Sequence, residues 1–479
     1  MIYRKPSGRL ILVTLLVFFL FSSIPVLGES TANNTASSEP YAIDGGSSPL
    51  NLPHGIAYSA KTGALIIADT QNHRILSCNL KDGKLTTLAG ITKGEDRFGS
   101  PGGGYADGDA AKAMFNYPRG VAVSENGTIV IADTGNHAIR QISGGIVSTI
   151  AGGKTAGYND GKGTAASFLS PGAVTVDTAG NIFVSDTLNN VIRKIDTKSN
   201  VTTFAGKKDA LDLLNEPAGL VFGKDGALYV TDGGNHQVKK ITDEGKITVL
   251  AGTHSEKDAA SGYYVGGYKD GPAESSAFNF PKGIAIKDDG TVFISDTSNH
   301  IIRAIKDNKV YTAAGAAGVA GEYLNSKYIS LLEEPAAIVY ADSTLFVADR
   351  YNNRILAIPD KNNRLSASGA AEAVAITYVA LLNGSEITFP DVRPEAAGEK
   401  LMLPIRPLTD MLGSKISWDP KKRTVTIVKD NKSTTLSYQA GDFSLKQGRA
   451  LVRSEILREK LNLKVKRLGE GDIILLETN

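Results

Sequence analysis

The sequence predicts a mainly β protein: a six-bladed β-propeller followed by a small duplicated α+β domain. The first observation behind this is a unit that recurs six times, each copy carrying a segment such as "ADTGNHAIRQI". The second is that each copy divides into short apolar-alternating segments, which are typical of strands. The third is that this glycine-rich rhythm stops near residue 373. Small sheets of this kind bury their faces by packing radially on their neighbours.

The second copy shows the unit most clearly, as "FNYPRGVAVSENGTIVIADTGNHAIRQISGGIVSTIAGG" over residues 115–153. We expect four strands, in "GVAVS", "TIVIAD", "AIRQI" and "IVSTIAG", because apolar and β-branched residues alternate there with polar ones. "SENG" and "SGG" supply turn residues. The propeller is expected over residues 48–369. "NRLSASG" (363–369) is the candidate outer strand of the sixth copy, so that the ring closes without a strand from the amino terminus.

The amino terminus has the pattern of an export signal over residues 1–28. Basic residues precede the apolar run "LILVTLLVFFLF" (10–21), and small residues precede a cut expected near Glu29. An uncleaved membrane anchor is the alternative, but the run is short for a span of about 20 residues. Residues 29–47 then read as a polar, flexible linker. We expect a secreted, extracellular protein with no integral membrane span after signal cleavage.

Charge and cysteine content narrow the function classes. The chain has 52 Lys and Arg against 50 Asp and Glu, which gives no electrostatic case for nucleic acid. Its single cysteine, Cys78, excludes an intramolecular disulfide and is most simply a small strand residue.

The repeated segments "PRGVAV", "IVIADTGNHAIRQI" and "VSTIAG" resemble the NHL repeat family. Asn136 and His137 match the first two letters of its Asn-His-Leu signature, although no copy keeps the leucine. The resemblance covers about residues 48–369 and implies a six-bladed propeller. It also implies a binding role, since members mostly bind proteins, nucleic acid or small ligands and only a few are lyases.

The recurring aspartates are interpreted as scaffold. Each ends the second strand of its copy, where a carboxylate can accept hydrogen bonds from amides of the turn that follows. Loss of one, for example in Asp133→Ala, should cost about 1–3 kcal/mol of stability. The six positions are Asp69, Asp133, Asp186, Asp232, Asp296 and Asp349.

The recurring histidines suggest a metal site, but their expected positions argue against one. They open the third strand of each copy, roughly 9–10 Å further from the propeller axis than the innermost strand. Ligands of one zinc ion must lie about 2 Å from a single point, so these side chains cannot share it. We expect neither a metal nor another cofactor. The histidines concerned are His73, His137, His236 and His300.

One end of the propeller is the candidate binding face, because the Asp-Thr-x-Asn loops and the Pro-x-Gly entries both lie there. His54, Arg119 and Lys282, from Pro-x-Gly, should surround the axial opening. Insertions at this end carry "GYADG", "GYNDG" and "GYKDG", which we interpret as braces between adjacent blades, with ligand binding as the alternative. Together the candidate residues suit an anionic or polar ligand. They are His54, Arg119, Lys282, Thr70, Thr134, Thr187, Thr297 and Arg350.

Residues 373–479 predict strand, helix and hairpin twice over. The stretch "MLPIRPLTDMLGSKISWDPKKRTVTI" resembles the copper amine oxidase N-terminal domain, which occurs in exported bacterial proteins without the oxidase. This part has no His and no Cys, so no histidine copper site can form in it, and the oxidase catalytic domain has no counterpart. Trp418 is expected in the core or in hairpin packing. The first helix should bury Ile405, Leu408, Met411 and Leu412.

These observations favour an exported, non-enzymatic binding or scaffold protein. Its propeller face would bind an extracellular protein, a peptide or a cell-wall glycan; the cell wall enters by analogy alone, since fold does not determine function. The alternative is a propeller lyase or hydrolase with its site at the axial opening. Lyases of the family that the repeats resemble need several metal-binding histidines near the axis, and only His54 is placed there. A third reading makes both domains spacers.

Overall fold

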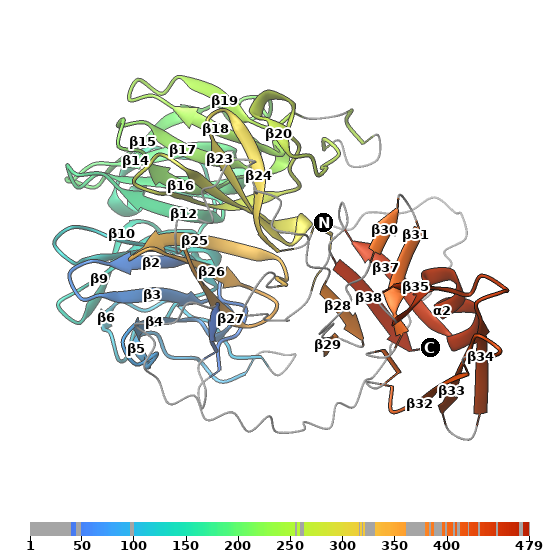
Figure 1. The fold of residues 1–479 in the computed structure, drawn as a ribbon. Helices are drawn as coiled ribbons and strands as arrows, with labels where there is room; N and C mark the ends of the chain where they lie inside the picture. The colour runs from blue at the N-terminus through green and yellow to red at the C-terminus, as the bar shows by residue number, and fades with distance from the viewer. Residues whose placement is uncertain are drawn as a thin grey trace, which may run out of the picture.

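The computed structural model describes residues 40–44, 49–95, 100–253, 256–258, 263–315, 317–318, 320 and 331–360, and most of 379–478. The expected signal (1–28) and the candidate strand at 363–369 lie outside the described residues. The predicted mainly β class is confirmed (Figure 1). No helix in the described part of the chain is long and apolar enough to cross a bilayer.

Six antiparallel sheets form the propeller within the described part of residues 40–360. We name them blades one to six in chain order. Their first strands, β2, β7, β12, β16, β21 and β25, contact one another in a closed ring and are therefore innermost. The strands are, in blade one, β2 (Ile56–Ser59), β3 (Ala64–Asp69), β4 (Arg74–Asn79) and β5 (Leu85–Ala89); in blade two, β7 (Pro118–Val123), β8 (Ile129–Asp133), β9 (Ala138–Ser143) and β10 (Ile146–Gly152); in blade three, β12 (Pro171–Val176), β13 (Ile182–Asp186), β14 (Val191–Ile195) and β15 (Asn200–Gly206); in blade four, β16 (Pro217–Phe222), β17 (Leu228–Asp232), β18 (Gln237–Ile241) and β19 (Ile247–Ala251); in blade five, β21 (Pro281–Ile286), β22 (Val292–Asp296), β23 (Ile301–Lys306) and β24 (Lys309–Gly315); and in blade six, β25 (Pro335–Ala341), β26 (Thr344–Asp349) and β27 (Arg354–Pro359).

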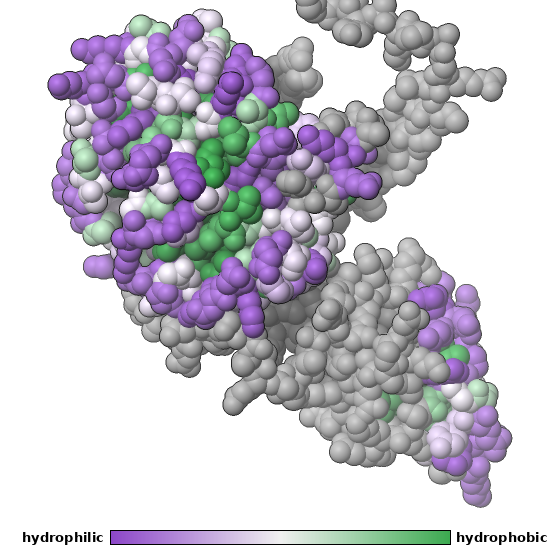
Figure 2. Space-filling model, turned by 90° about the horizontal axis from the view of Figure 1, so that it is seen from above, coloured by the Kyte–Doolittle hydropathy of each residue, from purple (hydrophilic) through white to green (hydrophobic). Residues whose placement is uncertain are grey.

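Short strands extend the outer edge of three blades. β6 (Gly108–Asp109), β11 (Gly161–Lys162) and β20 (Gly271–Pro272) pair with the fourth strands of blades two, three and five. Apolar side chains pack between neighbouring blades, as the core shared by blades one and two illustrates. In the view of Figure 2, hydrophobic residues gather in the middle of the propeller face and hydrophilic residues surround them toward its rim.

The outer strand of blade six comes from the amino terminus. β1 (Tyr41–Ile43) pairs antiparallel with β27, Tyr41 opposite Ala357 and Ile43 opposite Ile355. Ile43 is 5% exposed and lies in the core between blades one and six. The prediction that the ring closes without an amino-terminal strand is therefore wrong. Residues 41–43 belong to the propeller and not to the expected linker, because an apolar side chain there completes a core.

The inner strands of blades two to six are bulged at their start, directly after the proline. In blade two, Pro118 lies opposite Asp133, and regular pairing resumes only at Val121, so the register shifts between them. A bulge of this kind re-aims the side chains within it. A Cβ on Gly120 would lie 2.6 Å from the Cα of Ala173, so neighbouring inner strands approach too closely for a side chain at this position. The residue before the glycine is left to project toward the axis.

The second domain follows the predicted order of strand, helix and hairpin. Its strands and helix are β28 (Val379–Leu382), β29 (Ser385–Ile387), β30 (Glu395–Ala397), β31 (Lys400–Pro404), β32 (Lys415–Asp419), β33 (Thr424–Lys429), β34 (Lys432–Ser437), β35 (Phe443–Lys446), β36 (Arg449–Arg453), α2 (Ser454–Leu461), β37 (Leu463–Leu468) and β38 (Ile473–Thr478). β36, α2 and the hairpin β37–β38 form the second copy of the predicted unit.

The core of this domain contains two residues expected on its first helix, Ile405 and Leu408, with Leu412 packed against them. The Leu412 N–H donates to the Leu408 carbonyl oxygen at 3.1 Å, a helical hydrogen bond. Met411 lies outside the described residues. Trp418 is 43% exposed and meets the Phe443 ring edge-on at 6.0 Å, so it packs on the hairpin surface rather than in the core.

Candidate functional site

The recurring aspartates hold each blade together. In blade two, Asp133 Oδ1 accepts from the Asn116 N–H at 2.7 Å. Its Oδ2 accepts from Asn136 Nδ2 and Arg140 Nη1, both at 2.8 Å. The scaffold interpretation stands, but the predicted donors are wrong, because the carboxylate caps no amide of the turn that follows it. The same oxygen accepts in the other blades, in the pairs Asp69–Asn51, Asp186–Leu169, Asp232–Asn215, Asp296–Asn279 and Asp349–Glu333.

Buried arginines connect these aspartates to the Gly-Tyr-x-Asp-Gly insertions. The Arg140 guanidinium is fully buried, lies 4.6 Å from the Tyr105 ring centre, and forms a second ion pair with Asp107. Phe115, which follows the same insertion, lies in the core shared by blades one and two. The motif's own side chains thus contact blade two alone, whereas the following Phe115 packs between blades, so bracing by the motif itself stays a prediction. Arg193 with Tyr158 and Asp160, and Arg303 with Tyr268 and Asp270, repeat the arrangement.

The recurring histidines connect each blade to the next. His137 Nδ1 accepts from the Ser170 N–H at 3.1 Å, and Asn190, at the same position in blade three, accepts from the Glu216 N–H through Oδ1 at 2.8 Å. The Asn oxygen thus replaces the imidazole nitrogen as acceptor, which explains why two copies carry Asn. The remaining pairs are His73–Tyr117, His236–Phe280, His300–Glu334 and Asn353–Leu52.

A substitution at His137 should isolate the acid sensitivity of this connection. Burial lowers the pKa of His137, so the unfolded chain takes up a proton first as the pH falls below about 6.5. Stability contributed by the neutral ring is therefore present above that pH and lost below it. His137→Asn keeps the acceptor without titrating. We expect it to lose less stability than the parent between pH 7 and pH 5, by at most about 1.4 kcal/mol per pH unit. Urea unfolding at both pH values measures this; identical losses would contradict the assigned acceptor role.

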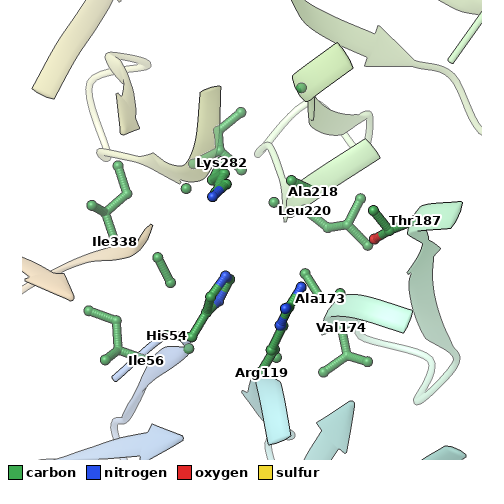
Figure 3. A pocket seen from close by; sticks show the side chains of 18 of the residues that line it. His54, Ile56, Arg119, Ala173, Val174, Thr187, Ala218, Leu220, Lys282 and Ile338 are labelled. Atoms are coloured by element: carbon green, nitrogen blue, oxygen red, sulfur yellow. The ribbon is translucent and has the colours of Figure 1, made fainter. Parts of the chain in front are cut away.

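An axial cavity of about 260 Å³ opens among the innermost strands. His54, Arg119 and Lys282 line it, at the axial opening where their Pro-x-Gly positions placed them. In Figure 3 the nitrogen-bearing ends of His54 and Arg119 point toward the space that Lys282 approaches from the opposite side. Each innermost strand also contributes one branched aliphatic residue to the wall. These are Ile56, Val121, Val174, Leu220, Ile284 and Ile338.

The cavity concentrates positive charge. Burial, and next the nearby Arg350, lowers the pKa of Arg119. Burial, and next the same arginine, also lower the pKa of Lys282. The carboxylates of Glu334 and Glu216 act in the opposite direction and raise that pKa. Burial and the surrounding cations hold the pKa of His54 well below its usual value, so its ring is neutral at pH 7. Within the described residues none of these three side chains forms an ion pair. Arg119 is exposed, and His54 and Lys282 are half-buried, so a ligand can reach all three from the opening.

The predicted threonines have a different role from the one proposed for them. Their hydroxyls donate to the proline carbonyl that begins the next blade's inner strand, as Thr134 Oγ1 does to Pro171 O at 2.7 Å. Their hydroxyl protons therefore form hydrogen bonds between blades. Of these four threonines, only Thr187 lines the cavity. The other bonds are Thr70 to Pro118, Thr187 to Pro217 and Thr297 to Pro335.

Arg350 lies outside the cavity wall. Its Nη1 is 3.1 Å from Glu334 Oε2, and its guanidinium lies 4.7 Å from the Tyr351 ring centre. Its charge is thus compensated by a carboxylate, unlike the charge of Arg119. The predicted contact of Arg350 with a ligand stays a prediction; its charge acts on all three cavity side chains.

The aliphatic wall residues escaped the sequence analysis, as did Glu216 and Phe280, each directly before the proline that begins an inner strand. Glu216 Oε1 accepts from the Tyr263 hydroxyl at 2.7 Å. The available signal was position, because the residue before this proline adopts a left-handed conformation in every blade. Of these six residues, Glu216 and Phe280 line the cavity. The φ values are 46° at Leu52, 48° at Tyr117, 52° at Ser170, 50° at Glu216 and 47° at Phe280 and Glu334.

Family models match both parts of the chain. The NHL repeat model matches residues 50–76 and 115–142, and the teneurin NHL domain model matches residues 210–306. The copper amine oxidase N-terminal domain model matches residues 381–476. These matches bear out both resemblances that the sequence predicted, to NHL repeats in the first part of the chain and to the copper amine oxidase N-terminal domain in the second.

Among curated proteins, the chain is 30% identical over 284 residues to Protein SUPPRESSOR OF QUENCHING 1, chloroplastic, of Arabidopsis thaliana, covering 54% of this chain and 25% of that protein. It is 27% identical over 358 residues to NHL repeat-containing protein 2 of Homo sapiens, covering 64% and 46%. The chain therefore spans a quarter to about half of the length of the curated relatives that it matches.

Solved structures of similar fold include an auxiliary nutrient binding protein from Bacteroides thetaiotaomicron, at 14% identity and a TM-score of 0.47, covering 63% of this chain and 67% of that one. Another is virginiamycin B lyase from Staphylococcus aureus, at 16% identity and a TM-score of 0.44, covering 67% and 98%.

Proposed function

We propose that this chain is an exported, non-enzymatic binding protein whose axial cavity takes a small anionic ligand. The observation that carries the proposal is the pair Arg119 and Lys282, two cations that line one cavity and form no ion pair within the described residues. An anion between them would supply the missing counter-charge through charge-assisted hydrogen bonds. A carboxylate or phosphate of a peptide or a cell-wall glycan has this chemistry. Export, and a place outside the cell, rest on the sequence pattern of residues 1–28.

Binding is favoured over the lyase or hydrolase alternative by the surroundings of His54. A histidine that acts as a general base needs a second group that orients its ring. The His54 side chain makes no hydrogen bond within the described residues, and its nearest charges are cationic. These neighbours leave the ring neutral but unoriented, which suits a hydrogen-bonding partner of a ligand better than a proton carrier.

Removing the two cations should abolish anion binding without unfolding the propeller. Each charge-assisted contact contributes about 1.5–3 kcal/mol, so Arg119→Ala and Lys282→Ala should each weaken binding roughly 10- to 150-fold. Isothermal titration with acetate and inorganic phosphate measures the loss. The matched control is Glu125→Ala with Asp288→Ala, two exposed residues in turns away from the cavity. Retained affinity in the cation variants, with loss in the control, would place the binding face at the wrong end.

A further inference from the structure

The wall of the axial cavity has two chemically distinct zones. The cationic zone consists of Arg119 and Lys282, with His54 beside them, each directly after the proline that precedes or begins an inner strand. Two positions further along each strand lies the ring of six branched aliphatic residues, each at most 8% exposed. Two residues of a strand advance about 6–7 Å along it. The aliphatic ring is therefore deeper in the propeller than the cations. It is formed by Ile56, Val121, Val174, Leu220, Ile284 and Ile338.

The layer between the two zones offers no polar side chain to a ligand. It consists of small residues, namely Gly55, Gly120, Ala173, Gly219, Gly283 and Ala337. Hydroxyls or further charges on the buried part of a ligand would lose water there without gaining side-chain partners, which is costly. An apolar group loses nothing and gains about 25 cal/mol for each Å² removed from water. This zone consequently favours a ligand whose buried part is apolar.

The two zones together define an amphipathic ligand. We propose that the axial cavity binds monocarboxylates with an apolar body, of the kind represented by medium-chain fatty acids and arylalkanoic acids. The carboxylate would lie between Arg119 and Lys282, with the neutral His54 as an additional hydrogen-bonding group, and the body would fill the aliphatic ring. An apolar cavity of about 150 Å³ accommodates benzene. The 260 Å³ present here therefore leaves room for a carboxylate in addition to a body of that size. This inference rests on the proposed anion binding and specifies the ligand class.

A chain-length series tests the inference on the full chain. Acetate, butanoate, hexanoate and octanoate are titrated by calorimetry, with inorganic phosphate, hexan-1-ol and hexylamine as controls. A buried methylene contributes about 0.8 kcal/mol, so affinity should rise roughly fourfold with each added methylene until the cavity is full. The alcohol and the amine should bind at least about tenfold more weakly than hexanoate, because neither supplies an anion to the two cations.

A variant of the aliphatic ring tests the assigned zone. Leu220→Ala enlarges the ring, so the chain length that binds most tightly, measured relative to acetate on the same variant, should become longer. Thermal unfolding checks that the variant is folded, and Val174→Ala gives the same readout with a smaller cavity change if it is not. Acetate and phosphate binding without any gain from chain length would overturn this inference and leave anion binding intact. Failure of every anion to bind, or equal affinity for hexan-1-ol and hexanoate, would overturn both.

Discussion

Replacing Arg303 with Met should lower the free energy of unfolding by about 3–5 kcal/mol, as removal of one partner of a buried ion pair does. Arg303 is fully buried in blade five, where its Nη1 donates to Asp296 Oδ2 at 2.8 Å and its Nε to Asp270 Oδ1 at 3.0 Å. Met retains an apolar stem of similar length but leaves the buried Asp296 charge without its cation. Urea unfolding followed by circular dichroism at pH 7 measures the loss.

The same strand provides a matched control for this prediction. Lys306, also in β23, forms an ion pair with Asp289 at 3.1 Å, but both side chains are partly exposed. Exposed pairs contribute about 0–1 kcal/mol, so Lys306→Met should change stability by no more than that. Equal losses in the two variants would show that burial of the Arg303 pair contributes nothing. Such a result would remove the physical basis for the brace predicted at the Gly-Tyr-x-Asp-Gly insertions.

Local, repeated patterns explain which parts of the site could be predicted. Pro-x-Gly recurs at the start of successive inner strands, so the position of its middle residue is the same in each blade. His54, Arg119 and Lys282 were therefore placed at the axial opening from spacing alone, and all three line the cavity. The strands of each blade could be predicted for a similar reason. Alternation of apolar and polar residues is a property of neighbouring positions in the sequence, and it shows which face of a strand is buried.

Contacts between distant positions explain the errors. Asp133 accepts from an amide 17 residues earlier in the chain, not from the adjacent turn, and Thr134 donates to Pro171, 37 residues later. Neither partner can be predicted from the neighbouring sequence, because only the folded blade and its contact with the next blade bring the two residues together. Glu216 was missed because its role depends on a left-handed backbone before proline, a conformation that the residue type does not signal.

The outer strand of blade six, β1, could not be predicted from the sequence repeats either. β1 has only three residues, "YAI", and carries none of the motifs that mark the six units. Its one strong contribution is Ile43, whose burial depends on a core built from blades one and six, more than 300 residues apart in the chain. A polar, serine-rich neighbourhood on its amino-terminal side favoured the interpretation as a linker instead.

Ile43→Asp should therefore destabilise the propeller by at least about 3 kcal/mol. The change removes a buried isoleucine, which costs about 2–5 kcal/mol when replaced by alanine, and adds a carboxylate with no partner in an apolar core. β1 should detach from β27 as a result, which leaves the edge of blade six unpaired. Urea unfolding measures the loss, and chymotrypsin cleavage at Tyr41 under native conditions reports the detached strand.

The neighbouring residue supplies the control, because successive side chains of a strand point to opposite faces. Ala42 pairs with Leu356 in the same ladder, but its side chain is exposed. Ala42→Asp places the same charge in the same strand on the solvent side, and we expect a stability change within about 0.5 kcal/mol. If Ile43→Asp costs no more than Ala42→Asp and Tyr41 stays equally protected in both, closure does not depend on β1. Another segment would then have to form the outer strand of blade six, and residues 363–369 would again be the candidate for it.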